Sequence, residues 1–284
     1  MNRYCDLHTH SNYSDGTFSP AEIIAEAKRI GLGAIALTDH NTVAGLFEFM
    51  EEARKQEILA VGGVELSTEY EAKEFHLLGL FVKPEHYRDV ERLTKEFFAL
   101  KEISNMETIE RLCEAGYMIS YADVRKKNAT GNVNRAHIAA ELLEKGYVES
   151  ISHAFQTVLS EEGGFYVPPT RLQLTDAIRF LREIDAIPVL AHPLKDVDEE
   201  SFRKMLPTMI EAGLMGMETY HSSYDAYTIK RAISIAEKFK LLQSGGSDFH
   251  GKNKPNIQLG CGKGNLEIPM VFYENLRRCQ GEHV

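Results

Sequence analysis

Short apolar runs recur along this chain, and many of them end in a histidine or a carboxylate. Runs of this kind, separated by stretches with helical periodicity, are typical of a parallel sheet or barrel in which strands alternate with helices. In such folds the carboxyl ends of the strands meet at one edge, where active sites are built. The residues at or just beyond these ends are His8, His10, Asp15, His40, Glu65, His76, His192, Asp248 and His250. We therefore expect these nine side chains to form one site.

The alternation of strand and helix signals runs through both ends of the chain. Strands are predicted over 4–8, 34–38, 59–65, 75–80, 187–191, 216–219 and 241–245. Helices are predicted over 20–31, 42–56, 175–184, 199–212 and 226–239. The first helix opens on Ser19-Pro20-Ala21-Glu22, a capping box with proline at the first helical position.

The middle of the chain lacks clear strand signals. It predicts one or two helices over 84–116 and further helices over 136–143 and 151–159. We therefore expect residues 1–99 and 171–284 to form a barrel domain, and residues 100–170 to form a helical insertion that caps the active-site mouth.

Composition limits the classes of partner. Hydrophobic residues make up 43% of the 284 residues and charged residues 26%, which is ordinary for a globular protein. The net charge of -10 argues against a broad electrostatic grip on long duplex nucleic acid or an anionic membrane. A small phosphorylated substrate remains compatible, because bound cations reverse the local sign of the field.

The sequence also predicts the cellular location and the oxidation state of the cysteines. The N-terminus has no apolar signal region and no run approaches a spanning length, so the cytoplasm is the expected location. The four cysteines form no CxxC pair, and we expect reduced, buried thiols rather than disulfides or a zinc site.

Imidazole and carboxylate are the ligands that divalent metal ions prefer in proteins. Nine such groups exceed the needs of one tetrahedral site, so two or three ions that share a bridging carboxylate are expected. Glu65 and His76 are each flanked by apolar residues, where a polar side chain needs a partner. Taken singly, Asp15 also fits a turn residue, and His40 a helix cap or core histidine.

The motifs together resemble the polymerase-and-histidinol-phosphatase (PHP) family of metal-dependent phosphoesterases. The matching stretches are Asp6-Leu7-His8-Thr9-His10-Ser11, Ser14-Asp15-Gly16, Thr38-Asp39-His40-Asn41, Gly63-Val64-Glu65, His76, Ala191-His192-Pro193 and Ser247-Asp248-Phe249-His250. The resemblance implies an α/β fold, a distorted (β/α)7 barrel with a site for two or three manganese, iron or zinc ions. It assigns the first ion to His8, His10, Glu65 and Asp248. It assigns the second to Glu65, His76 and His192, and the third to Asp15, His40 and His250. Some relatives carry histidine where this chain has Asp15.

The resemblance is strongest to small bacterial nucleotide phosphatases and 5′-3′ exoribonucleases. It implies an enzyme that removes the 3′-phosphate of 3′,5′-bisphosphonucleotides, trims short 5′-phosphorylated RNA, or does both, by attack of a metal-bridging hydroxide. Histidinol-phosphate phosphatase and a non-catalytic metal-binding regulatory module are the alternatives.

Further residues are candidates for catalysis and substrate binding. Asp248 and His221 are the candidate catalytic groups, with His221 contacting the leaving group or a phosphate unless it is a surface histidine. The stretch Asn134-Arg135-Ala136-His137 opens a predicted helix in the insertion. A guanidinium beside helix N–H groups can hold a phosphate, so Arg135 and His137 are candidate substrate contacts. The alternative for Arg135 is a surface ion pair.

Overall fold

The computed structural model describes residues 4–126, 133, 135–160, 162, 164–195 and 197–281. Asn134, which was expected to open a helix, lies outside these residues. The chain divides into two compact units. Unit 1 comprises Met1–Arg92 and Leu172–Val284, and unit 2 comprises Leu93–Arg171. The expected placement of the insertion over the active-site mouth stays a prediction.

Unit 1 is built on a sheet of seven strands that pair in the order of the sequence. The strands are β1 (Cys5–Asp6), β2 (Ala34–Leu37), β3 (Leu59–Tyr70), β4 (Lys73–Leu80), β5 (Ile187–Leu190), β6 (Gly216–His221) and β7 (Leu242–Gly246). The first and last strands approach each other, because the Leu7 N–H donates to Gly245 O at 3.0 Å and Thr9 pairs in parallel with Phe249. The sheet is therefore a nearly closed barrel, and the predicted α/β barrel fold is confirmed.

One strand departs from the parallel arrangement expected from the sequence. β4 is antiparallel to both β3 and β5, whereas β1, β2 and β3 are parallel to one another, as are β5, β6 and β7. The connection from β3 to β4 is only Glu71 and Ala72, which both have positive φ (49° and 60°). A tight two-residue turn forms a hairpin, whereas a parallel neighbour requires a long crossover. This hairpin distorts the barrel.

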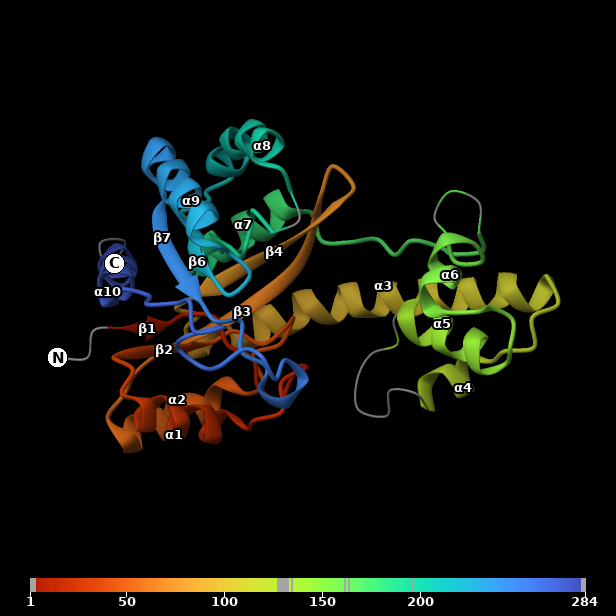
Figure 1. Cartoon of the computed structure of the whole chain (residues 1–284), viewed down its shortest axis with the longest axis horizontal. Helices are drawn as coiled ribbons and strands as arrows, with labels where there is room; N and C mark the ends of the chain where they lie inside the picture. Colours follow the sequence, from red (N-terminus) through yellow and green to blue (C-terminus); the bar gives the residue numbers. More distant parts are fainter. Residues whose placement is uncertain are drawn as a thin grey trace. The chain divides into compact units, whose positions relative to one another are not determined.

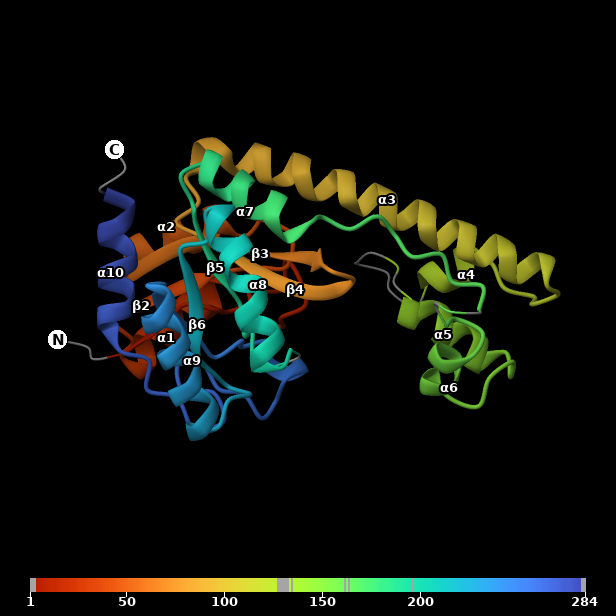
Figure 2. The ribbon, with the colours of Figure 1, turned by 90° about the horizontal axis from the view of Figure 1, so that it is seen from above.

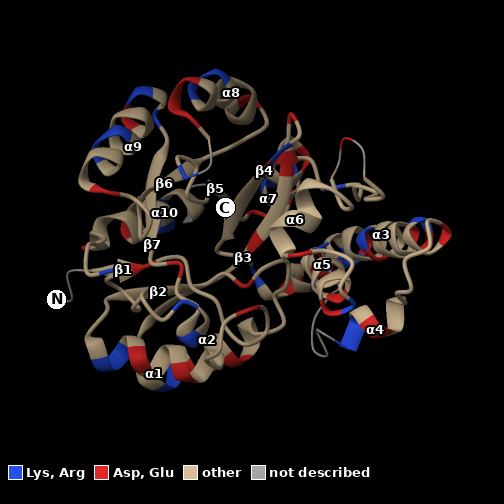
Figure 3. Cartoon of the chain, turned by 45° about the vertical axis from the view of Figure 1, so that its right-hand side comes forward, with Lys and Arg blue, Asp and Glu red and all other residues tan. Residues whose placement is uncertain are grey.

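The helices of unit 1 cover the outside of the barrel, with α1 and α2 on one side and α8 and α9 on another (Figure 1). They are α1 (Pro20–Ile30), α2 (Leu46–Gln56), α7 (Leu174–Glu183), α8 (Glu199–Glu211), α9 (Ala226–Phe239) and α10 (Met270–Gly281), with short 3-10 helices η1 (Pro84–His86) and η2 (Gly251–Asn253). The predicted capping box is present, since Ser19 and Glu22 each bond to the other's backbone N–H. Charged residues of unit 1 are frequent on the outer helices α1, α8 and α9 (Figure 3).

The apolar core of unit 1 lies inside the barrel. Side chains at the strand starts, including Cys5, Ala34 and Ile187, cluster with Phe272 and Leu276 of α10. Figure 2 shows α10 at the edge of the unit, beside the chain's described ends. Since α10 packs with the amino ends of the strands, the carboxyl ends remain available for the site.

Unit 2 is helical and has its own core. The long helix α3 (Tyr87–Glu114) begins in unit 1 and continues into unit 2, which also holds α4 (Tyr121–Lys126), α5 (Arg135–Glu144) and α6 (Ile151–Gln156). Leu112, Val124, Ile138, Leu142 and Leu159 are among the buried residues of its core.

Two other expectations can be compared with the structure. Among the described residues, no helix has the length and apolar character needed to cross a membrane. The four cysteines are free thiols. Cys5 is buried as expected, whereas Cys113 is exposed and Cys261 and Cys279 are partly exposed, so the expectation of buried thiols is wrong for these three.

Candidate metal centre

The carboxyl edge of the barrel carries the polar residues predicted from the sequence. His8 and His10 follow β1, His40 follows β2, and Glu65 lies within β3. His192 follows β5, while Asp248 and His250 follow β7. His76 lies in the first half of β4 and pairs with Ser67 of β3. Because β4 runs antiparallel, its first half lies at the edge where the parallel strands end.

The carboxylate of Glu65 is the centre of the cluster. It is completely buried, and its Oε2 lies 3.1 Å from Nε2 of both His8 and His10. The same oxygen lies 3.0 Å from His40 Nδ1. Its Oε1 lies 2.9 Å from His76 Nδ1 and 3.3 Å from His192 Nε2. One carboxylate therefore contacts five imidazoles, of which four lie beyond the ends of β1, β2 and β5 and one lies within β4.

Two aspartates extend the cluster on either side of His10. Asp248 Oδ1 lies 3.4 Å from His10 Nε2 and 3.8 Å from His8 Nε2. Asp15 is 56% exposed at its side chain, and its Oδ1 lies 3.1 Å from His250 Nε2. Its Oδ2 lies 3.9 Å from His40 Nε2. Asp15 is therefore part of the cluster, and its role is more than that of a turn residue.

Backbone strain accompanies two of these side chains. His192 and Asp248 have φ of 32° and 57°, in the left-handed region that residues with a Cβ seldom adopt. Such strain persists where the surrounding structure enforces it, and it gathers at functional sites. Both residues come two positions after the last residue of a strand, so the turn of the backbone directs their side chains into the cluster.

The donor set fits divalent cations. Ligand atoms lie within 4.8 Å of one another in three groups: His8, His10 and Glu65; His40, Glu65 and His76; and His10, Asp15, His40 and His250. Several atoms in these groups are buried and form no hydrogen bond, because even their close contacts lack hydrogen-bonding angles; they are Glu65 Oε2, His10 Nδ1, His40 Nδ1, His76 Nδ1 and His250 Nε2. A buried polar atom left unpaired costs about 1–3 kcal/mol. Coordination to cations would satisfy the atoms that face one another.

The electrostatics of the cluster favour the same conclusion. Burial by itself would raise the pKa of Glu65, but the imidazoles of His8, His40 and His76 hold it well below its usual value. Burial lowers the pKa of His40 to about 3 and also lowers the pKa of His192. For His8, His10 and His76 burial acts in the same direction, but the neighbouring carboxylates outweigh it and raise the pKa, that of His76 to about 10. An ionised carboxylate and a neutral imidazole are the forms that coordinate a metal ion, so metal binding would displace protons from the imidazoles whose pKa is raised.

Comparisons with known proteins agree with this geometry. The sequence profile of the PHP domain matches residues 6–166, which is more than half of the chain. A 5′-3′ exoribonuclease from Haemophilus influenzae is 32% identical over 251 residues, covering 88% of this chain and 91% of the relative. The chain belongs to the PHP family.

Other relatives show the range of the PHP family. A phosphoribosyl 1,2-cyclic phosphate 1,2-diphosphodiesterase from Eggerthella lenta is 30% identical, covering 87% of this chain and 94% of that protein. A 3′,5′-nucleoside bisphosphate phosphatase from Chromobacterium violaceum is 26% identical, covering 90% of each chain. The solved structure of a candidate metal-dependent phosphoesterase from Bifidobacterium adolescentis has a TM-score of 0.73 at 27% identity, covering 97% of this chain and 96% of that one. The protein is a PHP-family metal-dependent phosphoesterase.

The PHP site contains a buried carboxylate that the sequence reasoning missed. Glu218 in β6 is fully buried. Its Oε1 lies 3.0 Å from His8 Nδ1, and its Oε2 accepts the backbone N–H of His192 at 2.7 Å. The contact at Nδ1 leaves Nε2 of His8 facing Glu65. A glutamate within the apolar run Gly216-Met217-Glu218 was the available signal, by the same logic that selected Glu65.

A register shift in β6 explains how two of its residues reach the site. The pairing with β7 skips from Glu218 to Tyr220. A bulge of this kind re-aims the side chains that follow it, so that residues three positions apart can share one face of the strand. Glu218 and His221 therefore both contact the cluster.

His221 belongs to the site and is not a surface histidine. It is 2% exposed, its Nδ1 lies 2.8 Å from Ser223 Oγ, and its Nε2 lies 3.5 Å from Asp248 Oδ2. Lys254 also contacts Asp248, with Nζ at 2.7 Å from Oδ2. The sequence spacing does not show that the chain folds Lys254 back onto Asp248.

Two further aspartates hold the loops that carry the cluster. Asp6 Oδ1 accepts the Ser247 N–H at 2.9 Å, and its Oδ2 accepts the Gly260 N–H at 2.8 Å. Asp39 Oδ1 accepts the Ser11 N–H at 2.7 Å and the Ser14 hydroxyl at 2.6 Å. Both are buried. They fix the segments next to His8, Asp248 and Asp15 without contacting the centre of the cluster.

Arg135 and His137 belong to helix α5 of unit 2. The Arg135 guanidinium donates to Leu159 O at 2.5 Å and lies 4.7 Å and 4.3 Å from the ring centres of Phe155 and Tyr166. Arg135 is therefore packed against aromatic rings of its own unit. Partial burial, with the charge of Lys101, lowers the pKa of His137.

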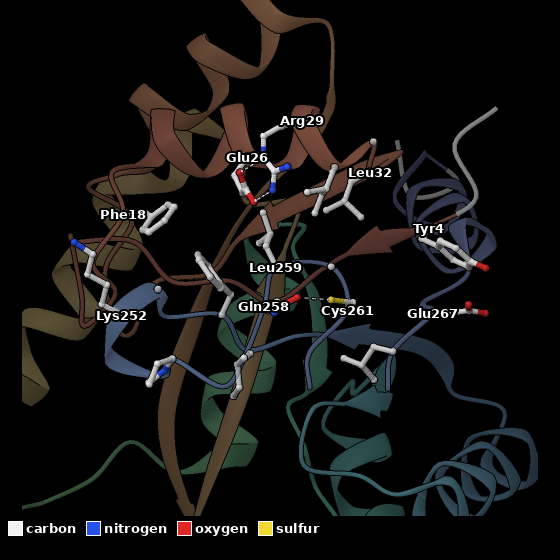
Figure 4. A pocket seen from close by; sticks show the side chains of 18 residues that line it. Tyr4, Phe18, Glu26, Arg29, Leu32, Lys252, Gln258, Leu259, Cys261 and Glu267 are labelled. Atoms are coloured by element: carbon white, nitrogen blue, oxygen red, sulfur yellow. Dashed lines mark hydrogen bonds and ion pairs between the residues drawn. The ribbon is translucent and has the colours of Figure 1, made fainter. Parts of the chain in front are cut away.

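Unit 1 has a separate pocket between α1 and the loop that follows Asp248 (Figure 4). Phe18, Leu32 and Leu259 line it, and the ion pair of Arg29 with Glu26 stands at its side. None of the nine predicted ligands lines this pocket. It is distinct from the metal centre.

Proposed function

We propose that this PHP phosphoesterase removes the 3′-phosphate of 3′,5′-bisphosphonucleotides and trims short 5′-phosphorylated RNA at the same site. The observation that carries the proposal is the set of overlapping donor groups around Glu65, whose buried atoms lack hydrogen-bond partners. Relatives of nearly full length are named for the exoribonuclease and bisphosphate phosphatase activities. These names support a nucleotide substrate, and the experiment below separates the two forms.

The proposed ligand assignment divides the cluster among three ions. His8, His10, Glu65 and Asp248 would hold the first ion, and Glu65, His76 and His192 the second. Asp15, His40 and His250 would hold the third. The position of Glu65 between His8 and His76 supports its bridging role. When bound, manganese, iron or zinc ions would supply an activated water and neutralise charge on the phosphoryl oxygens.

The chain's own residues supply orientation and a proton. His221 is buried beside Asp248, and its Nε2 lacks a hydrogen-bond partner. We assign His221 the role of contacting the leaving oxygen, to which Nε2–H can donate a proton, with Ser223 Oγ, 2.8 Å from Nδ1, orienting the imidazole. Barriers to phosphoester cleavage fall when the departing oxygen is protonated as its bond breaks. Arg135 and His137 are retained as proposed substrate contacts of unit 2.

The test is phosphate release by the manganese-loaded protein from four substrates. They are adenosine 3′,5′-bisphosphate, AMP, histidinol phosphate and a short 5′-phosphorylated RNA. A preference for the bisphosphate or the RNA supports the proposal and separates its two forms. A preference for histidinol phosphate would support the alternative function, histidinol-phosphate phosphatase, and refute the proposed nucleotide substrate.

A further inference from the structure

A pocket in unit 1 opens beside two of the clustered histidines. It is lined by Lys73, Glu74, Phe75, His76, Ala191, His192, Pro193, Lys195 and Val197. His76 and His192 both contact Glu65 Oε1, so one wall of the pocket is the metal centre itself. A substrate whose scissile phosphate lies at Glu65 can therefore extend into this space.

Two lysines reach the pocket from different elements. Lys73 begins β4 at the tip of the hairpin, and Lys195 follows β5, where its N–H donates to His192 O at 3.0 Å. Within the part of the chain that the structure describes, neither ammonium forms an ion pair within 4 Å. The Glu74 carboxylate contacts His76 Nε2 at 3.3 Å. Asp198 caps α8 by accepting the Ser201 N–H at 2.9 Å, and this contact, together with the more distant charge of Lys73, lowers the pKa of Asp198.

We infer that this pocket is a subsite for a second phosphate group, the one that the substrate does not lose. The chain carries a net charge of -10, so two exposed lysines lining a pocket beside the metal centre are a local concentration of positive charge. An ammonium is a point-charge binder of phosphate, and the apolar side chains of Phe75, Pro193 and Val197 offer a surface for the nucleoside. The inference rests on the proposed function and adds to it the residues that would select a doubly phosphorylated substrate.

The test compares two substrates that share the scissile group. Adenosine 3′,5′-bisphosphate and adenosine 3′-monophosphate differ only in the 5′-phosphate. The variant is Lys73→Met with Lys195→Met, which removes both charges and retains most of each side chain's length. Lys230→Met, on the exposed face of α9 and outside the pocket, is the matched control.

We expect the double variant to raise KM for the bisphosphate about tenfold, which corresponds to about 1.4 kcal/mol. Its kcat on both substrates and its KM for the monophosphate should stay at wild-type values. Salt should raise the wild-type KM for the bisphosphate more than that of the double variant, because the lysines are exposed and screened. An RNA with a 5′-phosphate, compared with the same RNA carrying a 5′-hydroxyl, tests whether the subsite also accepts an RNA end.

Three other outcomes would refute either the phosphate subsite or the proposed function. If the wild type prefers the bisphosphate and the double variant keeps that preference, the second phosphate is held elsewhere and the inference is wrong. If the wild type hydrolyses both adenosine substrates equally well, the phosphatase function stands and the subsite is refuted. If it hydrolyses neither, the proposed function fails, and the inference fails with it.

Discussion

Replacing Glu218 by glutamine would remove one hydrogen-bond acceptor from the buried cluster and keep the side chain's shape. The carboxylate accepts at both oxygens, from the His8 ring at 3.0 Å and from the His192 N–H at 2.7 Å. An amide has one acceptor oxygen, and its NH2 group would face the second donor. Glu218→Gln must therefore break one of the two contacts.

The magnitude follows from the burial of these groups. Glu218 and His8 are both 0% exposed, so water cannot replace the lost partner. A buried donor left unsatisfied costs about 1–3 kcal/mol. Removing a carboxylate that hydrogen-bonds a metal-binding histidine, without itself binding the metal, typically lowers metal affinity by roughly 10–100-fold. We expect Glu218→Gln to lower the Mn²⁺ affinity within that range and to lower the melting temperature of the metal-free protein.

Calorimetric titration with Mn²⁺, beside thermal unfolding of the metal-free protein, measures both effects. Glu211→Gln, a change at an exposed position at the end of α8, is the matched control and should leave both values unchanged. If Glu218→Gln binds Mn²⁺ with wild-type affinity, Glu218 does not orient His8. If it melts early but binds normally, its role is confined to stability.

Three further substitutions and two experiments on Cys5 test other parts of the structure. Glu65→Gln should abolish turnover and reduce bound metal; a normal rate at full metal content would refute the site. Gly246→Ala would place a Cβ 2.1 Å from His8 Cβ. It should lower the free energy of unfolding by about 1–3 kcal/mol, measured in urea, and weaken Mn²⁺ binding. An unchanged midpoint of urea unfolding would contradict this expectation. Arg135→Ala should weaken hydrolysis of a bisphosphate far more than that of an aryl phosphate, with a thermal melt as control for its packing on Tyr166; equal losses would remove Arg135 from substrate selection. Burial raises the pKa of Cys5 from 9.0 to about 12, so iodoacetamide at pH 8 should modify the exposed Cys113 before Cys5. Equal rates of alkylation at the two cysteines would contradict this expectation. Between pH 9.0 and about 12 the folded Cys5 keeps a proton that the unfolded chain has lost, so the free energy of unfolding should fall as pH rises.

Much of the barrel and of the cluster could be predicted from local sequence. A buried strand is an apolar run, and the residue after it stands at the edge of the sheet, whatever the rest of the chain does. His8, His40, His192 and Asp248 were found on that basis, and the structure brings them to one edge. Glu65 was found because a carboxylate between two apolar residues needs a partner.

The remaining features depend on which strands pair. The orientation of β4 follows from its two-residue turn and from pairing with both β3 and β5. That orientation puts His76 at the edge of the site, although it lies in the first half of its strand. The bulge in β6 exists only relative to β7, and it brings Glu218 and His221 to the same face.

The sequence by itself determined the strand ends, the donor types and hence the kind of chemistry, because each is a property of a short segment. Only the tertiary structure decided that one glutamate contacts five imidazoles, that Glu218 holds His8 and His192, and that Lys73 and Lys195 line one pocket. Some of these contacts join residues more than a hundred positions apart in the chain, such as Glu65 with His192 and Glu218 with His8. Their geometry is set by strand register and barrel closure, which no single segment encodes.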